Sequence, residues 1–166
     1  MTRKALTAAA LAIAALVASQ ASHAQALGFG AGGEFYVPTC GFTAVDVDLL
    51  RHDADRFTGV GSATPWQYFT LGSTGCSASV TAVNLTFRGV ADPDNTNLHA
   101  FPGIPGVGVD ITSWDNEEAG PNGVTKAWAP RPTGEGYLYR ARLMQTLPSI
   151  TPGTGRAAIT VDVSYN

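Results

Sequence analysis

The sequence predicts an all-β fold, a sandwich of short strands. Glycine and proline number 19 and 10 of the 166 residues, and they are spread along the chain rather than gathered in one linker. The segments between them alternate apolar and polar residues with a period of two, as half-buried strands do. No amphipathic helix of ten or more residues follows the first 26 residues. Many short strands separated by turn residues are typical of a β-sandwich.

The first residues are typical of a secretory signal peptide. Arg3 and Lys4 precede ALTAAALAIAALVA, an apolar run that is too short to span a bilayer. Small residues then place the cleavage site after Ala24 or Ala26. We therefore expect a signal peptide over 1–26, a short N-terminal extension over 27–36 and one folded domain over 37–166.

Charge and cysteine content limit the function further. Cleavage removes two basic residues, so the formal net charge falls from −3 to about −5. Such a domain has no basic surface for nucleic acid or anionic membranes, and we expect no nucleic-acid partner. Cys40 and Cys76 would reach an oxidising compartment, where one disulfide is the default expectation.

Six segments show the alternation expected of strands. In the fifth, Tyr137 and Tyr139 begin a row of apolar side chains, and Arg140 and Arg142 point to the opposite face. In the last, an apolar row starts at Ile159 and continues to the penultimate residue. The segments span residues 44–50, 66–71, 79–89, 107–111, 137–145 and 157–165. The stretches 91–97 and 114–123 carry turn formers and charge, and we expect them to be loops.

A glycine motif near the N-terminus matches the dinucleotide-binding pattern G-x-G-x-x-G. Gly28, Gly30 and Gly33 occupy its three glycine positions. The motif requires a strand before it and a helix after it, to seat a pyrophosphate. Here a signal peptide precedes it and GEFYVPTC follows, so nucleotide binding is rejected. Apolar residues fall at alternate positions from Leu27 to Val37, which favours an extended strand.

No catalytic or metal site can be argued from the sequence. The loop at 92–97 starts like a calcium loop, but Asn97 and Gly103 stand where an EF-hand needs glycine and glutamate, which favours a solvated turn. His52 and His99 lack ligand partners at suitable spacing, and we expect them on the surface or in loops. No G-x-S-x-G nucleophile motif is present. We expect a protein that is not an enzyme and that uses no cofactor or metal.

Several segments together match one known family in order and spacing. They are GEFYVPTC before the first cysteine, WQYFTLGSTGC before the second, VNLTFRGVADPDNTNL, GVGVDI and YRARLMQTLPSITPGTGRAAITVDVSYN. In the order and spacing of these segments, the sequence resembles pilins of the chaperone–usher pathway and is similar to type 1 fimbrial major subunits. The resemblance covers almost all of the chain after the signal peptide.

The resemblance implies an incomplete immunoglobulin-like sandwich that lacks its last strand and is completed by a donated strand. A periplasmic pilus chaperone would first lend that strand, and an outer-membrane usher and other pilin subunits would then build a homopolymer or a mixed fibre. The chain would be exported through the periplasm to a cell-surface fimbrium that serves adhesion. It implies a fold-stabilising disulfide between Cys40 and Cys76. It also implies groove residues for the chaperone or donor strand: Gly153, Ile159, Val161, Val163, Tyr165 and, through its terminal carboxylate, Asn166.

The chain departs from the family before the first cysteine, because the expected extension is short and glycine-rich. Leu27, Phe29, Ala31 and Gly33 are the candidate donor-strand residues. Either the donor segment is compressed, or the subunit accepts a strand without donating a good one.

The main alternative is a stand-alone secreted β-sandwich module that binds carbohydrate. Trp66, Trp114 or Trp128 would form its platform. Tryptophan in a sandwich more often packs in the core or at its rim, which favours the pilin interpretation. A secreted hydrolase is less favoured still, because no nucleophile, base or metal cluster is present.

Overall fold

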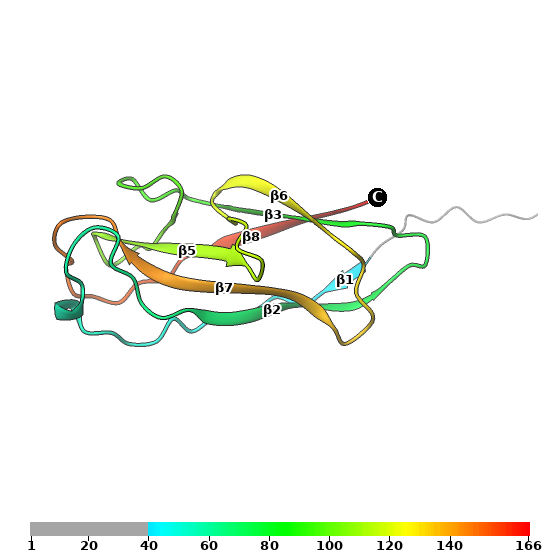
Figure 1. Cartoon of the computed structure of the whole chain (residues 1–166), viewed down its shortest axis with the longest axis horizontal. Helices are drawn as coiled ribbons and strands as arrows, with labels where there is room; N and C mark the ends of the chain where they lie inside the picture. The colour runs from blue at the N-terminus through cyan, green and yellow to red at the C-terminus, as the bar shows by residue number, and fades with distance from the viewer. Residues whose placement is uncertain (1–39) are drawn as a thin grey trace, which may run out of the picture. The chain divides into compact units, whose positions relative to one another are not determined.

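A computed structural model describes residues 40–166, and Figure 1 shows their strands in two layers. The expected signal peptide and the donor candidates Leu27, Phe29, Ala31 and Gly33 lie outside these residues and stay predictions. The described elements are β1 (Cys40–Phe42), a 3₁₀ turn η1 (Ala54–Arg56), β2 (Gln67–Cys76), β3 (Val83–Gly89), β4 (His99–Ala100), β5 (Val107–Ser113), β6 (Asn122–Trp128), β7 (Gly136–Gln145) and β8 (Ile159–Tyr165). None of the described helices has the length and apolar character needed to cross a membrane.

The strands form one five-stranded and one three-stranded sheet. The first has the order β1-β2-β7-β5-β4 and the second β6-β3-β8. All the strand pairs are antiparallel. In the second sheet β8 pairs with β3 along its whole length, from Gly89 opposite Ile159 to Val83 opposite Tyr165. The predicted all-β sandwich is confirmed.

The prediction of a strand over 44–50 is wrong, because the segment is not assigned to any strand. Thr43 N still donates to the Gly72 carbonyl of β2 at 3.3 Å, but no strand is assigned from Thr43 to Asp53. Val47 and Leu49 remain half-buried while their neighbours are exposed. The period of two therefore marks the buried face correctly at Val47 and Leu49 but not at Val45, which is exposed, and no strand of the described chain pairs with this segment. β1, β4 and β6 were not predicted, and β6 begins within the expected loop 114–123.

The core lies between the two sheets and is centred on β7. Tyr137, Tyr139, Ala141 and Leu143 are buried, whereas Arg140 and the other outward residues of β7 are only half-buried. The predicted alternation of this strand is therefore confirmed. The inward residues of β3, Val83, Leu85 and Phe87, meet them from the opposite sheet.

Two buried tyrosines form an aromatic cluster with Trp128. The Trp128 ring packs edge-on against Tyr137 and Tyr139, with centroids 5.6 and 5.8 Å apart. Trp128 Nε1 donates a hydrogen bond of 2.9 Å to the Tyr139 hydroxyl. Burial raises the pKa of Tyr139 to about 12, because the phenolate would lie in the core. Trp128 is thus half-buried and packs with its ring against the core, which disfavours it as the binding platform of the alternative module.

His99 contradicts the expectation of a surface histidine. It lies on β4 with 1% of its area exposed, and its Nε2 is 2.8 Å from the Ala119 carbonyl oxygen. The two-residue strand β4 is too short to show a period, so no pattern in the sequence indicates this burial. His52 is half-buried and its Nε2 lies 2.8 Å from the Leu49 carbonyl.

Mild acid is expected to destabilise the domain through His99. Burial lowers the pKa of His99, so the unfolded chain takes up a proton at a higher pH than the folded domain does. The free energy of unfolding should therefore be constant above the ordinary histidine pKa of about 6.5 and fall as the pH drops below it. Urea unfolding of the exported chain between pH 7.5 and 5.5 measures this. His99→Gln should flatten the profile; an equally steep profile in that variant would assign the effect to other groups.

Candidate functional site: an open apolar groove

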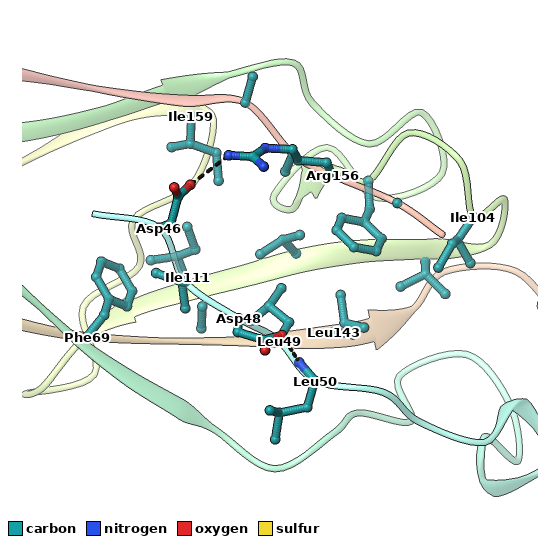
Figure 2. A pocket seen from close by; sticks show the side chains of 18 of the residues that line it. Asp46, Asp48, Leu49, Leu50, Phe69, Ile104, Ile111, Leu143, Arg156 and Ile159 are labelled. Carbon is teal, nitrogen blue, oxygen red and sulfur yellow. Dashed lines mark hydrogen bonds and ion pairs between the residues drawn. The ribbon is translucent and has the colours of Figure 1, made fainter. Parts of the chain in front are cut away.

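The described domain contains a large groove between β8 and the extended segment 43–53. Its volume is about 1790 Å³, and residues of both sheets line it. Figure 2 shows the segment carrying Asp46 and Leu49 passing over a floor provided by β5 and β7. We call this space the groove. Its floor is formed by the inward residues of the strands. Its two lips are the segment 43–53 and residues 152–163.

The floor of the groove is apolar. Its side chains come from inward positions of β2, β3, β5 and β7, where alternation directs them towards the core. They include Phe69, Leu71, Phe87, Val107, Val109, Ile111, Ala141 and Leu143. Phe101, Ile104 and Ile150 extend the apolar lining beyond the strand ends. Burial of such surface is worth about 25 cal/mol per Å², so an apolar occupant would bind favourably.

One lip of the groove is β8, whose second edge has no partner strand among the described residues. Ile159, Val161 and Val163 line the groove, and they are half-buried rather than buried. The intervening residues Thr160, Asp162 and Ser164 are exposed. An unpaired edge with an apolar row presents backbone donors and acceptors together with side-chain sites for one more strand.

The other lip is joined to residues 152–163 by an exposed ion pair, which lies just before β8. Arg156 Nη2 and Asp46 Oδ1 are 2.7 Å apart, as Figure 2 shows, and their side chains are 83% and 90% exposed. Such exposed pairs contribute little stability. The lip bends at Leu50, whose φ of 64° is unusual for leucine, and Asp48 Oδ1 accepts a 2.8 Å hydrogen bond from Leu50 N. The contacts closing the groove are thus weak, and an incoming strand could displace them.

Gly153 lines the groove where the chain approaches β8. A Cβ atom at this position would lie 2.4 Å from the Gly103 carbonyl oxygen, so no side chain fits without movement of the backbone. Close contact between two backbone segments is the reason that glycine stands here.

Tyr165 and Asn166 lie beyond the residues that line the groove. The Tyr165 hydroxyl donates a 2.7 Å hydrogen bond to the Cys40 carbonyl oxygen. Asn166 O accepts hydrogen bonds from Thr81 N at 2.7 Å and from Ala82 N at 3.2 Å. The structure therefore brings four of the six predicted groove residues together, and places these two at the end of β8, with Tyr165 beside Cys40 and Asn166 beside Thr81 and Ala82.

The predicted disulfide between Cys40 and Cys76 is formed. It joins β1 to the end of β2, with a Cα–Cα distance of 4.1 Å, and closes a loop with a sequence separation of 36. β1 leads directly into the segment 43–53. The disulfide thus fixes the start of one lip.

The described residues offer no constellation for metal binding. Within residues 40–166, no group of three or more His, Cys, Asp and Glu side chains could hold an ion. In the loop at 92–97, Asp92 is 4% exposed, and its Oδ1 accepts hydrogen bonds of 3.0 Å from Asp94 N and Asn95 N. This aspartate closes a turn with its own backbone, so the expectation that the whole turn is solvated was wrong for Asp92.

Alternation alone would have named most of the floor, because Phe69, Ile111 and Leu143 lie on predicted strands. It gives no sign that this part of the core is open. Openness depends on which strands are adjacent in space, and that is a property of the topology.

Comparison with known proteins finds relatives among fimbrial subunits. No protein-family model matches the chain. The S-fimbrial protein subunit SfaG of Escherichia coli O6:K15:H31 is 32% identical over 123 residues, which cover 72% of this chain and 70% of SfaG.

Among solved structures, the P pilus rod subunit PapA superposes with a TM-score of 0.63, at 14% identity, over 77% of this chain and 92% of PapA. A chain from the structure of a chaperone–usher pilus superposes with a TM-score of 0.59, at 13% identity, over 86% of this chain and 97% of that one. These two likenesses concern the fold.

Proposed function

This chain belongs to the fimbrial subunits, and we propose that it is a pilin of the chaperone–usher pathway that enters a surface fimbria by accepting a strand from another chain in its groove. It is an all-β protein with an incomplete immunoglobulin-like sandwich, and it is not an enzyme. The observation that carries the proposal is the groove itself, a channel with an apolar floor next to a strand edge that no described strand covers.

The mechanism follows from the shape of the groove. A strand laid beside β8 would continue its sheet through backbone hydrogen bonds. Every second side chain of that strand would point towards the floor and contact Phe69, Ile111 and Leu143. The occupant must therefore alternate apolar and small or polar residues. The subunit needs no chemistry for this, because the free energy comes from burial and pairing.

The first donor in this proposal is a periplasmic pilus chaperone. Its strand would pair with β8 and pack on Ile159, Val161 and Val163. Asn166 O accepts hydrogen bonds from Thr81 N and Ala82 N, which would hold the end of β8 in place beside the chaperone's strand. Tyr165, held on the Cys40 carbonyl, would fix the end of the strand.

The second donor is the N-terminal extension of another subunit, delivered at an outer-membrane usher. In a homopolymer that extension is residues 27–36, with Leu27, Phe29 and Ala31 pointing to the floor and Gly33 allowing close backbone approach. The finished fibre would stand on the cell surface and serve adhesion.

Co-expression with the chaperone and usher is expected to yield polymers that resist detergent until they are heated. Strand exchange buries a continuous apolar row, so dissociation requires unfolding of the sandwich. Gel electrophoresis of cell-surface extracts, with and without boiling, measures this: a ladder without boiling should collapse to one band afterwards. Material that runs only as a monomer before boiling would contradict polymerisation by this route.

A further inference from the structure

We propose that the outer face of the five-stranded sheet carries a binding site for a sugar carboxylate, formed by Trp66, Tyr68, Trp114, Arg140 and Arg142. We call these five residues the aromatic–arginine patch. The patch lies on the face of β2, β7 and β5 opposite to the core, so it is separate from the groove. The proposal goes beyond subunit assembly and does not depend on it.

The register of the strands places the patch residues side by side. Tyr68 is opposite Arg140, and Arg140 is opposite Thr112 on the next strand. Gln67 is opposite Ala141, so Trp66, which precedes Gln67, flanks Arg142. On the other side of Arg142 lies Asp110 of β5. On the other side, Trp114 N donates to the Leu138 carbonyl at 3.0 Å. Residues directly opposite on one face of a sheet are in contact distance.

Two of the three aromatic side chains of the patch are exposed, and the third, Trp66, is half-buried. Tyr68 is 60% exposed and Trp114 is 63% exposed, whereas Trp128 is half-buried against the core. The two guanidinium carbons of Arg140 and Arg142 lie 4.2 and 4.0 Å from the centroid of the Trp66 ring. These cation–π contacts hold the indole and both guanidinium groups in one place. A rigid platform of aromatic rings suits the apolar face of a sugar.

The charges favour one carboxylate as the ligand group. Arg142 Nε is paired with Asp110 Oδ2 at 2.9 Å, but no described carboxylate lies within ion-pair distance of Arg140. Arg140 Nε donates to Thr112 Oγ1 at 3.0 Å, and its Nη2 donates to Asn116 Oδ1. Two of its five donors are thereby engaged, which fixes the side chain and leaves other donors for a ligand. A guanidinium matches the geometry of a carboxylate.

The rim of the patch argues against a dense polyanion. Glu118 forms an isolated β-bridge with Thr112, and Thr112 is the strand partner of Arg140. Asp110 is the strand partner of Arg142. These carboxylates would repel a closely spaced row of negative charges. They can accept hydrogen bonds from sugar hydroxyl groups. The favoured ligand is therefore a glycan with isolated carboxylates, such as a uronic or a sialic acid residue in an otherwise neutral chain.

Binding to the full exported chain, immobilised in whatever assembly is recovered from the cell, tests this site. The probes are a hyaluronan tetrasaccharide and its carboxyl-reduced form, 3′-sialyllactose and lactose, and a heparin tetrasaccharide. We expect at least one carboxylated probe to bind at least tenfold more tightly than its neutral counterpart, and heparin to bind more weakly than that probe. The preferred probe identifies the source of the carboxylate. Equal binding of carboxylated and neutral forms, tightest binding of heparin or no binding at all would overturn the proposal.

Arg140→Gln should lower the affinity for the preferred probe at least tenfold, and Arg140→Lys should give an intermediate value because it keeps the charge without the planar fork. Tyr68→Ala should weaken binding without affecting the core. The matched control is Arg88→Gln, since Arg88 is an exposed arginine on the outer face of the other sheet, paired with Asp162. Unchanged binding in Arg140→Gln, or an equal loss in Arg88→Gln, would contradict the assignment. Because binding is measured per chain, a chain that does not polymerise still reports on this site.

Discussion

Val163→Asp is expected to abolish both chaperone capture and incorporation into fibres. Val163 points from β8 into the groove, where a donated strand would bury it completely. Burying an unpaired carboxylate in apolar surroundings costs several kcal/mol. A cost of about 3 kcal/mol already corresponds to a loss of roughly a hundredfold in affinity. Co-purification with the chaperone and the amount of surface polymer measure the two losses.

The neighbouring residue provides the control for this substitution. Ser164 lies on the exposed side of the same strand, so Ser164→Asp adds the same charge one residue away without entering the groove. Its chaperone capture and polymer yield should stay close to those of the unmodified chain. Equal losses in both variants would show that charge on β8, rather than the groove, decides the result.

Loss of the disulfide is expected to lower the free energy of unfolding by about 4 kcal/mol, from the chain-entropy estimate for a loop of this length. That is a large share of the 5–15 kcal/mol typical of a single domain. The Cys40→Ala/Cys76→Ala variant avoids new intermolecular disulfides. Because β1 also fixes the start of one lip, this variant should be captured poorly by the chaperone.

Urea unfolding of the exported chain, with and without dithiothreitol, measures the disulfide contribution. The unmodified chain in dithiothreitol should match the double variant, and the double variant should not respond to the reductant. An unchanged unfolding midpoint in the double variant would mean that the lip and the sandwich hold without the covalent link.

Strands with one buried face were predictable from the sequence, because burial imposes a period of two. β7 and β8 show this most clearly, with Tyr137 to Leu143 and Ile159 to Tyr165 at alternate positions. β6 escaped prediction because it starts with the turn formers Asn122 and Gly123 and exposes Val124. β4 has two residues, too few for any period.

The segment 44–50 is predicted as a strand but is not one in the structure. Its alternation is as regular as that of β8, yet it is not part of a described sheet. Apolar periodicity records which side chains face the core, whereas strand assignment requires a hydrogen-bonded neighbour. The sequence therefore indicated both lips of the groove. It could not indicate that the space between them is open, since that depends on how the two sheets are joined.

Photocrosslinking from the floor of the groove can show whether another chain fills it. Phe69 lines the groove and stacks on Tyr139 with centroids 5.9 Å apart, so p-benzoylphenylalanine can replace it while keeping an aromatic ring. Fibres grown from mixed light and heavy isotope-labelled copies would be irradiated and digested, and the crosslinked peptides identified by mass spectrometry. If a neighbouring subunit fills the groove, crosslinks should form between a light and a heavy chain, from position 69 to residues 27–36. Crosslinks confined to single chains would contradict filling by another chain.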